Sequence, residues 1–436
     1  MGTRERARRY AQHDGAAPTW YEASARARPA WPALDGDARA DVCVIGGGYT
    51  GLSCALHLAE RGYDTLLLEA RRIGNGASGR NGGQLGSGHR RDQSTLEREL
   101  GAEPARLLWS LAEEAKALVS ARIARHGIAC DLKPGIAIAA HRRRYARELA
   151  REAARLRDVY GYGEIDVLDR AGMRAEVDSE DFCGGLLDRG AGHLHPLDYA
   201  LGLARAAADA GVDIREGTPV TGLVPGAPCR VRAGPHTVSA DAVVLACNGY
   251  LDALDPGIGG DVMPINNFIL ATEPLGEERA RALIPRDVAV VDTRFVVNYF
   301  RLSADRRLLF GGGEKASTRL PADPGPLVRR CMLRIFPQLA GVRIDHAWGG
   351  TLAITWTRMP SIGRLPGGLY FAQGYSGHGV ALATLGGALV AEAICGTLER
   401  FDVFARLPHR PFPGGALLRW PTLALALAYG ALRDRL

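Results

Sequence analysis

The chain lacks the patterns that indicate a metal site, a secreted protein or a membrane span. Its eight cysteines are scattered, with no CxxC pair and no cysteine–histidine cluster, so we expect reduced thiols and no bound metal. The N-terminal residues Met1 to Asp14 are highly charged and have no apolar core, unlike a secretory signal. No apolar run approaches the ~20 residues that a membrane span needs. We therefore expect a cytoplasmic protein.

Lysine is almost absent. Lys116, Lys133 and Lys315 are the only lysines, and arginine supplies nearly all of the positive charge. The net charge of +6 is spread over 436 residues without a basic stripe and interleaved aromatics, so nucleic acid is not an expected partner. The apolar tail from Thr422 to Ala431 is expected to pack against the protein, with light membrane contact as the alternative.

The stretch from Ala40 to Gln84 carries the strongest signal in the chain. The predicted elements are a strand at 41–45, a helix at 50–61 and a strand at 65–68. Three glycines in G-x-G-x-x-G spacing join the first strand to the helix: Gly46, Gly48 and Gly51. Glu69 ends the second strand, where an acid accepts hydrogen bonds from ribose hydroxyls and disfavours a 2′-phosphate. This context predicts a dinucleotide site and argues against NADP.

Two further segments are rich in glycine. The segment 74–84 has no apolar side chain beyond one alanine, which indicates either a flexible surface loop or a loop whose backbone lies against a flat ligand. Near the other end, a predicted strand at 369–372 leads through Gly374-Tyr375-Ser376-Gly377-His378-Gly379 into a predicted helix at 381–395. The N-terminus of such a helix favours an anion.

Together these motifs resemble the flavin amine oxidases of the D-amino acid oxidase and glycine oxidase superfamily, and the likeness covers nearly the whole chain. In that superfamily a GASGRNGG loop lines FAD. The resemblance, with the motifs, implies FAD contacts from Gly46, Gly48, Tyr49, Thr50, Gly51, Glu69, Ala70, Ser78, Gly79, Arg80, Asn81, Gly82, Gly83, Gln84, Val220, Cys247, Asn248, Gly374, Tyr375, Ser376, Gly377, His378 and Gly379. No cysteine can be assigned to a covalent flavin link, so non-covalent FAD is expected.

The resemblance also implies the fold, an α/β FAD-binding lobe of Rossmann type with an inserted α+β substrate domain built on an antiparallel sheet. Strands predicted at 288–291, 296–302 and 307–313 leave no room for long helices between them. We expect an N-terminal arm at 1–39, an FAD domain at 40–128, 190–258 and 345–400, a substrate domain at 129–189 and 259–344, and a tail at 401–436.

The implied reaction is the oxidation of a C–N bond in a small-molecule amine, by hydride transfer to the flavin. The resulting imine hydrolyses to an aldehyde, and O2 is reduced to hydrogen peroxide. Within the superfamily the likeness is greatest to oxidases of γ-glutamyl amines such as γ-glutamylputrescine. Arg301 and Arg358 are candidates for binding the substrate carboxylate, Tyr299 for a pocket wall or hydrogen-bond donor, and His378 for flanking the flavin. For the two arginines, a surface or interface position is the alternative, and for the tyrosine, a core position.

Some alternatives stay open. Sarcosine oxidases of this superfamily place a lysine on a strand beside the flavin, but the comparable strand at 307–310 has none and Lys315 lies beyond Gly313. Another electron acceptor is therefore an alternative to O2. A dehydrogenase of N-alkyl amino acids or opines, and a non-catalytic dinucleotide-binding protein, are the other hypotheses. His193 and His195 are expected to be structural, with a place near the flavin possible for one of them.

Overall fold

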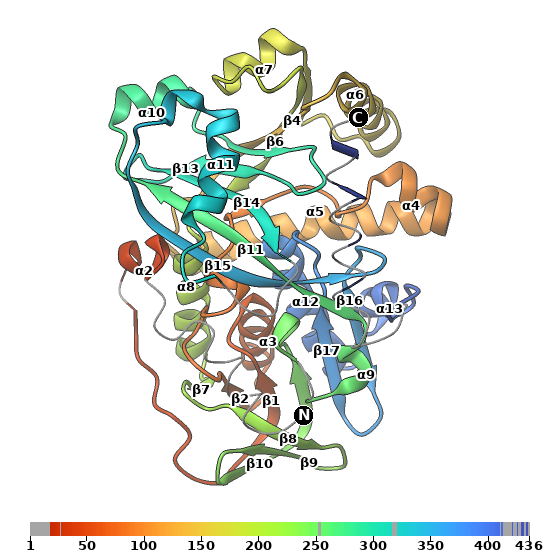
Figure 1. Ribbon diagram of the computed structural model, residues 1–436. Helices are drawn as coiled ribbons and strands as arrows, with labels where there is room; N and C mark the ends of the chain where they lie inside the picture. The colour runs from red at the N-terminus through yellow and green to blue at the C-terminus, as the bar shows by residue number, and fades with distance from the viewer. Residues whose placement is uncertain are drawn as a thin grey trace.

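The computed structural model describes residues 18–26, 28–251, 254–315, 321–409 and 411–412, together with Pro421, Leu425, Tyr429, Gly430, Arg433 and Asp434. The charged N-terminal stretch and most of the apolar tail of the sequence analysis lie outside these residues. Figure 1 shows two sheets, one above the other, with helices on their outer faces and at their sides.

The lower sheet is the predicted α/β lobe. Its strands run in the order β16-β17-β10-β1-β2-β7, with β9 paired to β10 and β8 to β9. The four pairs β17–β10, β10–β1, β1–β2 and β2–β7 are parallel. The strands are β1 (Ala38–Ile45), β2 (Thr65–Leu68), β7 (Asp213–Arg215), β8 (Val220–Val224), β9 (Cys229–Ala233), β10 (His236–Leu245), β16 (Ser361–Leu365) and β17 (Leu369–Gln373).

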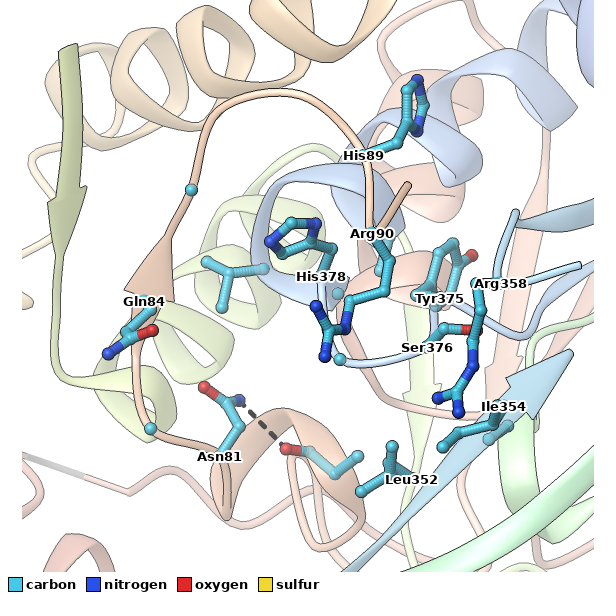
Figure 2. A pocket seen from close by; sticks show the side chains of 18 of the residues that line it. Asn81, Gln84, His89, Arg90, Leu352, Ile354, Arg358, Tyr375, Ser376 and His378 are labelled. Carbon is cyan, nitrogen blue, oxygen red and sulfur yellow. Dashed lines mark hydrogen bonds between the residues drawn. The ribbon is translucent and has the colours of Figure 1, made fainter. Parts of the chain in front are cut away.

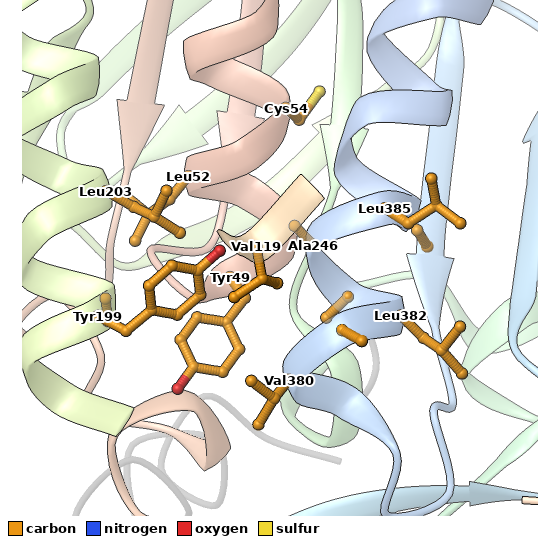
Figure 3. Packing of buried hydrophobic residues seen from close by; sticks show 14 of the residues in the cluster. Tyr49, Leu52, Cys54, Val119, Tyr199, Leu203, Ala246, Val380, Leu382 and Leu385 are labelled. Atoms are coloured by element: carbon orange, nitrogen blue, oxygen red, sulfur yellow. The ribbon is translucent and has the colours of Figure 1, made fainter. Parts of the chain in front are cut away.

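Four helices pack around this lobe: α3 (Tyr49–Ala59), α5 (Ala102–Arg125), α8 (Pro196–Asp209) and α12 (Gly379–Ile394). Their apolar side chains form the largest core cluster, part of which is drawn in Figure 3. In that view Tyr49 lies between α8 and α12, and its ring is 5.2 Å from the ring of Tyr199. The start of α3 is therefore fixed from both sides, because α8 and α12 flank it.

The upper sheet is mostly antiparallel, with strand order β15-β11-β14-β13-β12-β4-β6-β3 and β5 paired to β6. Its strands are β3 (Gln84–Leu85), β4 (Lys133–Ala139), β5 (Ile165–Leu168), β6 (Gly185–His193), β11 (Val262–Thr272), β12 (Ala289–Asp292), β13 (Tyr299–Leu302), β14 (Leu308–Lys315) and β15 (Ile344–Thr355). The helices α6 (Arg143–Tyr160), α7 (Arg170–Glu176), α10 (Glu277–Leu283) and α11 (Gly325–Ile335) lie around it (Figure 1). This is the predicted inserted sheet.

The remaining elements are short. They are α2 (Trp20–Ser24), α4 (Gln93–Leu100), α9 (Pro256–Gly259), α13 (Glu399–Ala405) and the 3-10 turns η2 (Ala77–Gly79), η3 (Asn248–Tyr250) and η4 (Pro337–Leu339). Trp20 and Tyr21 of α2 are buried, so these two aromatic side chains anchor α2 to the protein.

One domain boundary differs from its expected position. The sequence analysis placed the return to the FAD lobe at residue 345, but β15 pairs with β11 along its whole length and so belongs to the upper sheet. We therefore propose a boundary after Thr355 in place of the one at 345. The rest of the domain division stays a proposal.

Among the described residues, no single helix is both long enough and apolar enough to cross a membrane. Taken together, α12 and α13 reach the length and the apolar composition of a membrane span, but the pair is bent by 119° at the break between the two helices.

The contact between α3 and α12 depends on Gly387. A Cβ at this position would lie 2.8 Å from the amide nitrogen of Cys54 and in closer contact with the carbonyl oxygen of Thr50. We therefore expect Gly387→Ala to force the helices apart, to lower stability by about 1–3 kcal/mol and to reduce the Tm in a thermal melt. Gly341→Ala is the control, because a Cβ at residue 341 meets nothing within 4 Å. Equal Tm values for the two variants would contradict this packing.

Candidate cofactor and substrate site

A cavity of about 1500 Å³ lies between the two sheets and is lined by residues of both. The lower part of its wall comes from the three glycine-rich motifs. The upper part comes from β4, β6, β12, β13 and β15, and from α5 and α6. A volume of this size exceeds the usual range for a drug-sized ligand. It has room for a dinucleotide and a substrate together.

The first glycine turn requires its glycines for steric reasons. Gly46 has a φ of +116°, and a Cβ there would lie 2.7 Å from the carbonyl oxygen of Ala246. A Cβ on Gly51 would clash with the carbonyl oxygen of Gly46, so the helix can approach the turn only without one. Gly48 is the N-cap of α3 and contributes no side-chain cap. The positive end of α3 is thus open toward the cavity, as a pyrophosphate site needs.

Glu69 is held at the end of β2 by two backbone amides. Its Oε2 accepts from Gly47 N at 2.7 Å and its Oε1 from Arg71 N at 2.9 Å. Burial raises the pKa of this carboxyl above its ordinary value. The side chain lines the cavity beside the glycine turn. The position of the Glu69 carboxyl group fits the hydrogen bonds to ribose hydroxyls that the sequence predicts, and those bonds stay a prediction.

The loop 74–84 is fixed by hydrogen bonds within the loop and to the start of α3. Ser78 Oγ accepts from Tyr49 N at 3.0 Å, and Asn81 Nδ2 donates to the carbonyl oxygens of Ala77 and Ser78 at 3.0 and 2.9 Å. Gly83 N donates to Asn81 Oδ1 at 2.7 Å. Because this loop lines the cavity rather than the outer surface, the flexible-loop alternative is not supported.

The third glycine-rich motif, residues 374–379, contacts the start of α3 and the segment that follows β10. Tyr375 Oη and Thr50 Oγ1 are 2.7 Å apart, and Gly374 N donates to Asn248 Oδ1 at 3.0 Å. His378 is the N-cap of α12, so a second helix N-terminus is directed at the cavity. Burial, and the nearby positive charge of Arg90, lower the pKa of His378 to about 3, so this imidazole is neutral at physiological pH.

An arch formed by residues 84–91 crosses the cavity (Figure 2). Leu85 pairs with Gly192 of β6, a Cβ on Gly86 would lie 3.4 Å from His378 Nε2, and Arg91 Nη1 donates to the carbonyl oxygen of Thr357 at 3.2 Å. Figure 2 shows the Arg90 side chain extending from the arch into the cavity, beside His378. Sequence reasoning missed Arg90, because nothing in the local pattern distinguishes it from its neighbour Arg91.

Arg358 enters the same cavity from the turn after β15 (Figure 2). Its φ of 62° is unusual for a residue with a side chain, and strain of this kind is often held at functional sites. The turn is fixed by Thr355, whose Oγ1 donates to the carbonyl oxygen of Met359 at 2.7 Å and whose N donates to Ser376 Oγ at 3.2 Å. The third motif therefore positions Arg358.

Tyr299 and Arg301 lie on the same strand but have different surroundings. Tyr299 lines the cavity, and its hydroxyl donates to Asn267 Oδ1 at 2.5 Å. Arg301 is only 2% exposed and is not part of the cavity wall. Its Nε donates to the carbonyl oxygen of Gly82 at 2.9 Å and its Nη2 to Tyr21 Oη at 3.4 Å. In this placement Arg301 supports the loop from behind, so we do not assign substrate binding to it.

Most of the predicted cofactor residues line the cavity. They are Gly46, Gly48, Tyr49, Thr50, Glu69, Ala70, Ser78, Arg80, Asn81, Gly82, Gln84, Val220, Cys247, Asn248, Tyr375, Ser376, Gly377, His378 and Gly379. The four that do not are glycines packed against other backbone or side-chain atoms: Gly51, Gly79, Gly83 and Gly374. These four shape the motifs without facing the cavity.

The two histidines considered earlier have structural partners. His195 is the N-cap of α8, and its Nδ1 accepts from Asp198 N at 3.0 Å. His193 Nε2 lies 2.8 Å from the carbonyl oxygen of Asp287. Neither lines the cavity. Within the described part of the chain, no group of three or more His, Cys, Asp or Glu residues could hold a metal ion.

Comparisons with known proteins agree with this geometry. A family model described as "DAO: FAD dependent oxidoreductase" matches residues 41–393. The chain is 44% identical to γ-glutamylputrescine oxidoreductase of Escherichia coli, over 96% of this chain and 98% of that protein. It is 41% identical to the probable oxidoreductase OrdL of Rhizobium meliloti, over 96% and 97%. The crystal structure of glycine oxidase from Geobacillus kaustophilus superposes with a TM-score of 0.73 at 25% identity, covering 86% of this chain and all of that one.

The position of Glu69 generates a prediction about cofactor affinity. Glu69→Gln keeps the size of the side chain but replaces one acceptor oxygen with a donor that faces a backbone N–H. We expect the FAD Kd to rise at least about tenfold, the loss of one charge-assisted hydrogen bond. Titration of the apoprotein with FAD, followed by flavin fluorescence, measures this. Asp64→Asn, an exposed acid before the same strand, should leave the Kd unchanged. An unchanged Kd for Glu69→Gln would exclude the assigned role.

Proposed function

The chain belongs to the DAO family of FAD-dependent oxidoreductases, and from this premise we propose that it oxidises the terminal amine of a γ-glutamyl amine such as γ-glutamylputrescine. FAD is its cofactor. In the proposed reaction R–CH2–NH2, O2 and water give R–CHO, ammonia and hydrogen peroxide. FAD, when bound, supplies the acceptor for the two electrons that leave the C–N bond.

The observation that carries the proposal is the 44% identity to the E. coli γ-glutamylputrescine oxidoreductase over almost the full length of both chains. The cavity supports it, because it extends from the glycine turns past Tyr299 to the apolar side chains of Ile136, Ile138 and Leu186. Such a wall suits the four-carbon spacer of putrescine, whose burial is favourable by about 0.8 kcal/mol for each CH2 group.

The carboxylate of the γ-glutamyl group needs a cationic partner. We assign this role to Arg358 and add Arg90, since both guanidinium groups extend into the same cavity (Figure 2). A planar guanidinium matches a carboxylate with two parallel hydrogen bonds. The hydrogen bond from Arg91 to Thr357 joins the two segments that carry these arginines. Tyr299, fixed by Asn267, forms a wall of the pocket.

The substrate amine must be unprotonated when its C–N bond is oxidised. Cationic side chains in the cavity favour the neutral form of an amine, because a like charge lowers its pKa. The neutral His378 ring adds no further charge and is able to accept a hydrogen bond. These side chains act on the protonation state of the substrate, and no protein nucleophile is required.

The acceptor of the electrons is the least supported part of the proposal. Neither Lys116 nor Lys133 lines the cavity, and their Nζ atoms each lie 2.9 Å from a carboxylate, that of Glu113 and that of Asp287 respectively. This observation favours an electron acceptor other than O2 as a second possibility. A measurement of hydrogen peroxide distinguishes O2 from another electron acceptor, because only O2 gives peroxide.

The direct test is anaerobic mixing of the FAD-loaded protein with γ-glutamylputrescine while flavin absorbance is followed. We expect rapid bleaching, then recovery of the colour and stoichiometric peroxide when air is admitted. Bleaching without peroxide would replace the oxidase by a dehydrogenase. If the flavin stays oxidised with this substrate but is bleached by N-alkyl amino acids or opines, the proposed substrate is wrong.

The proposed carboxylate site is tested by comparing substrates with and without that group. Arg358→Gln and Arg90→Gln should each raise the KM for γ-glutamylputrescine about 10- to 100-fold, the loss of a charged hydrogen bond. The same variants should barely change the KM for N-acetylputrescine, which has no carboxylate. Arg364→Gln, on the exposed face of β16, is the control. A parallel loss with both substrates would contradict carboxylate recognition.

A further inference from the structure

The cavity wall beside α5 holds a buried polar cluster that neither the cofactor motifs nor the carboxylate assignment uses. Lys116 of α5 is 7% exposed, and its Nζ lies 2.6 Å from Ser87 Oγ, 2.9 Å from Glu113 Oε2 and 3.0 Å from the carbonyl oxygen of Gly190. Tyr162 Oη is a further acceptor at 3.3 Å, so all three donors of the ammonium group are engaged within the protein. Lys116 is therefore a fixed internal charge that holds Ser87 of the arch in place.

Asp188 of β6 is the second buried charge of this cluster. It is 5% exposed, and its Oδ1 accepts from Tyr162 Oη at 2.5 Å and from Ala191 N at 3.1 Å. Burial and the adjacent Asp188 raise the pKa of Tyr162, so its hydroxyl stays protonated and donates. Gly190 is required here, because a Cβ would clash with the Tyr162 hydroxyl. The carboxylate is thus oriented by two donors from one side.

The open side of the cluster faces the cavity. Ser87, Trp109, Tyr162 and Asp188 all line it, whereas Lys116 and Glu113 stand behind them. Trp109 packs edge to face against Tyr162, with ring centroids 5.2 Å apart. Two carboxyl groups, Glu113 and Asp188, stand here with one lysine, Lys116, whose ion pair at 2.9 Å is with Glu113. A cavity wall with an excess carboxylate and an indole ring attracts a cation.

We propose that Asp188, with Tyr162 and Trp109, binds a second ammonium group of the substrate, one that does not react. In a γ-glutamyl amine this group is the α-ammonium of the glutamyl head, so the inference rests on the proposed function. The reacting amine is excluded from this site by its chemistry. An adjacent carboxylate raises the pKa of an amine and keeps it charged, but the reacting nitrogen must be neutral.

The arch gives a second reason why the proposed site would bind the α-ammonium group of the glutamyl head. Ser87 contacts the cluster, and Arg90, three residues along the same arch, enters the cavity with its guanidinium group. One short segment thus presents a cation-binding wall and an anion-binding side chain to the same space. An α-amino acid head group carries the two matching charges on a single carbon.

The experiment uses two ligands that lack the terminal amine and differ in one group. γ-Glutamyl-n-butylamide carries the α-ammonium, and glutaryl-n-butylamide has hydrogen in its place. Calorimetric titration of the FAD-loaded protein should give a Kd about 10- to 100-fold lower for the first ligand. Asp188→Asn, which keeps an acceptor for Ala191 N, should reduce this preference to about one. Asp166→Asn is the control and should retain the preference. Asp166 lies on β5, opposite Leu187 of β6, and does not line the cavity.

Tyr162→Phe is the second variant, for the case that Asp188→Asn does not fold, as judged by FAD content and Tm. It leaves Asp188 in place without one of its donors, and we expect an intermediate preference. A preference near one in the wild type, or a wild-type preference in a folded Asp188→Asn or in Tyr162→Phe, would overturn the inference. If the protein prefers γ-glutamyl-n-butylamide but γ-glutamylputrescine does not bleach the flavin, the ammonium site is supported and the proposed reaction is wrong. If γ-glutamylputrescine bleaches the flavin but the two ligands bind equally well, the proposed reaction is supported and the ammonium site is wrong.

Discussion

The close approach of backbone at the first glycine turn is the constraint on which the rest of the structure depends. The start of α3 can touch the turn only because Gly51 has no side chain, and the turn can pass β10 only because Gly46 has none. With these contacts made, β1 and β10 pair in parallel and bring Cys247 and Asn248 to the same edge. Asn248 then accepts from Gly374 N, so segments far apart in sequence meet around one helix N-terminus.

The parts of the fold that depend on local signals could be predicted from the sequence. β2 was predicted with its observed bounds, 65–68. The glycine turn between β1 and α3 was predicted as well, and Gly46 in that turn has a positive φ. The motif residues that line the cavity were predicted for the same reason, because a glycine-rich loop is itself the signal.

Features set by distant contacts could not be predicted. Three strands, β12, β13 and β14, lie between β11 and β15 in the sequence, and no local pattern fixes the pairing of β11 with β15 or the domain boundary that follows from it. Arg301 and Arg358 look alike in sequence, yet one is enclosed by Gly82 and Tyr21 and the other enters the cavity. No local sequence pattern marks Asp188, because the role proposed for it depends on Tyr162 and on a cavity formed by other strands.

The arch 84–91 connects the glycine-rich loop to the upper sheet and to the turn that carries Arg358. It begins as β3, where Leu85 pairs with β6 of the upper sheet, and it ends where Arg91 reaches the turn that carries Arg358. Between these points Gly86 lies against His378 of the third motif, and Ser87 lies against the buried Lys116. Because every one of these contacts belongs to a different part of the chain, the arch can take this path only when both sheets are folded. The cavity is thus completed by the segment that directly continues the glycine-rich loop.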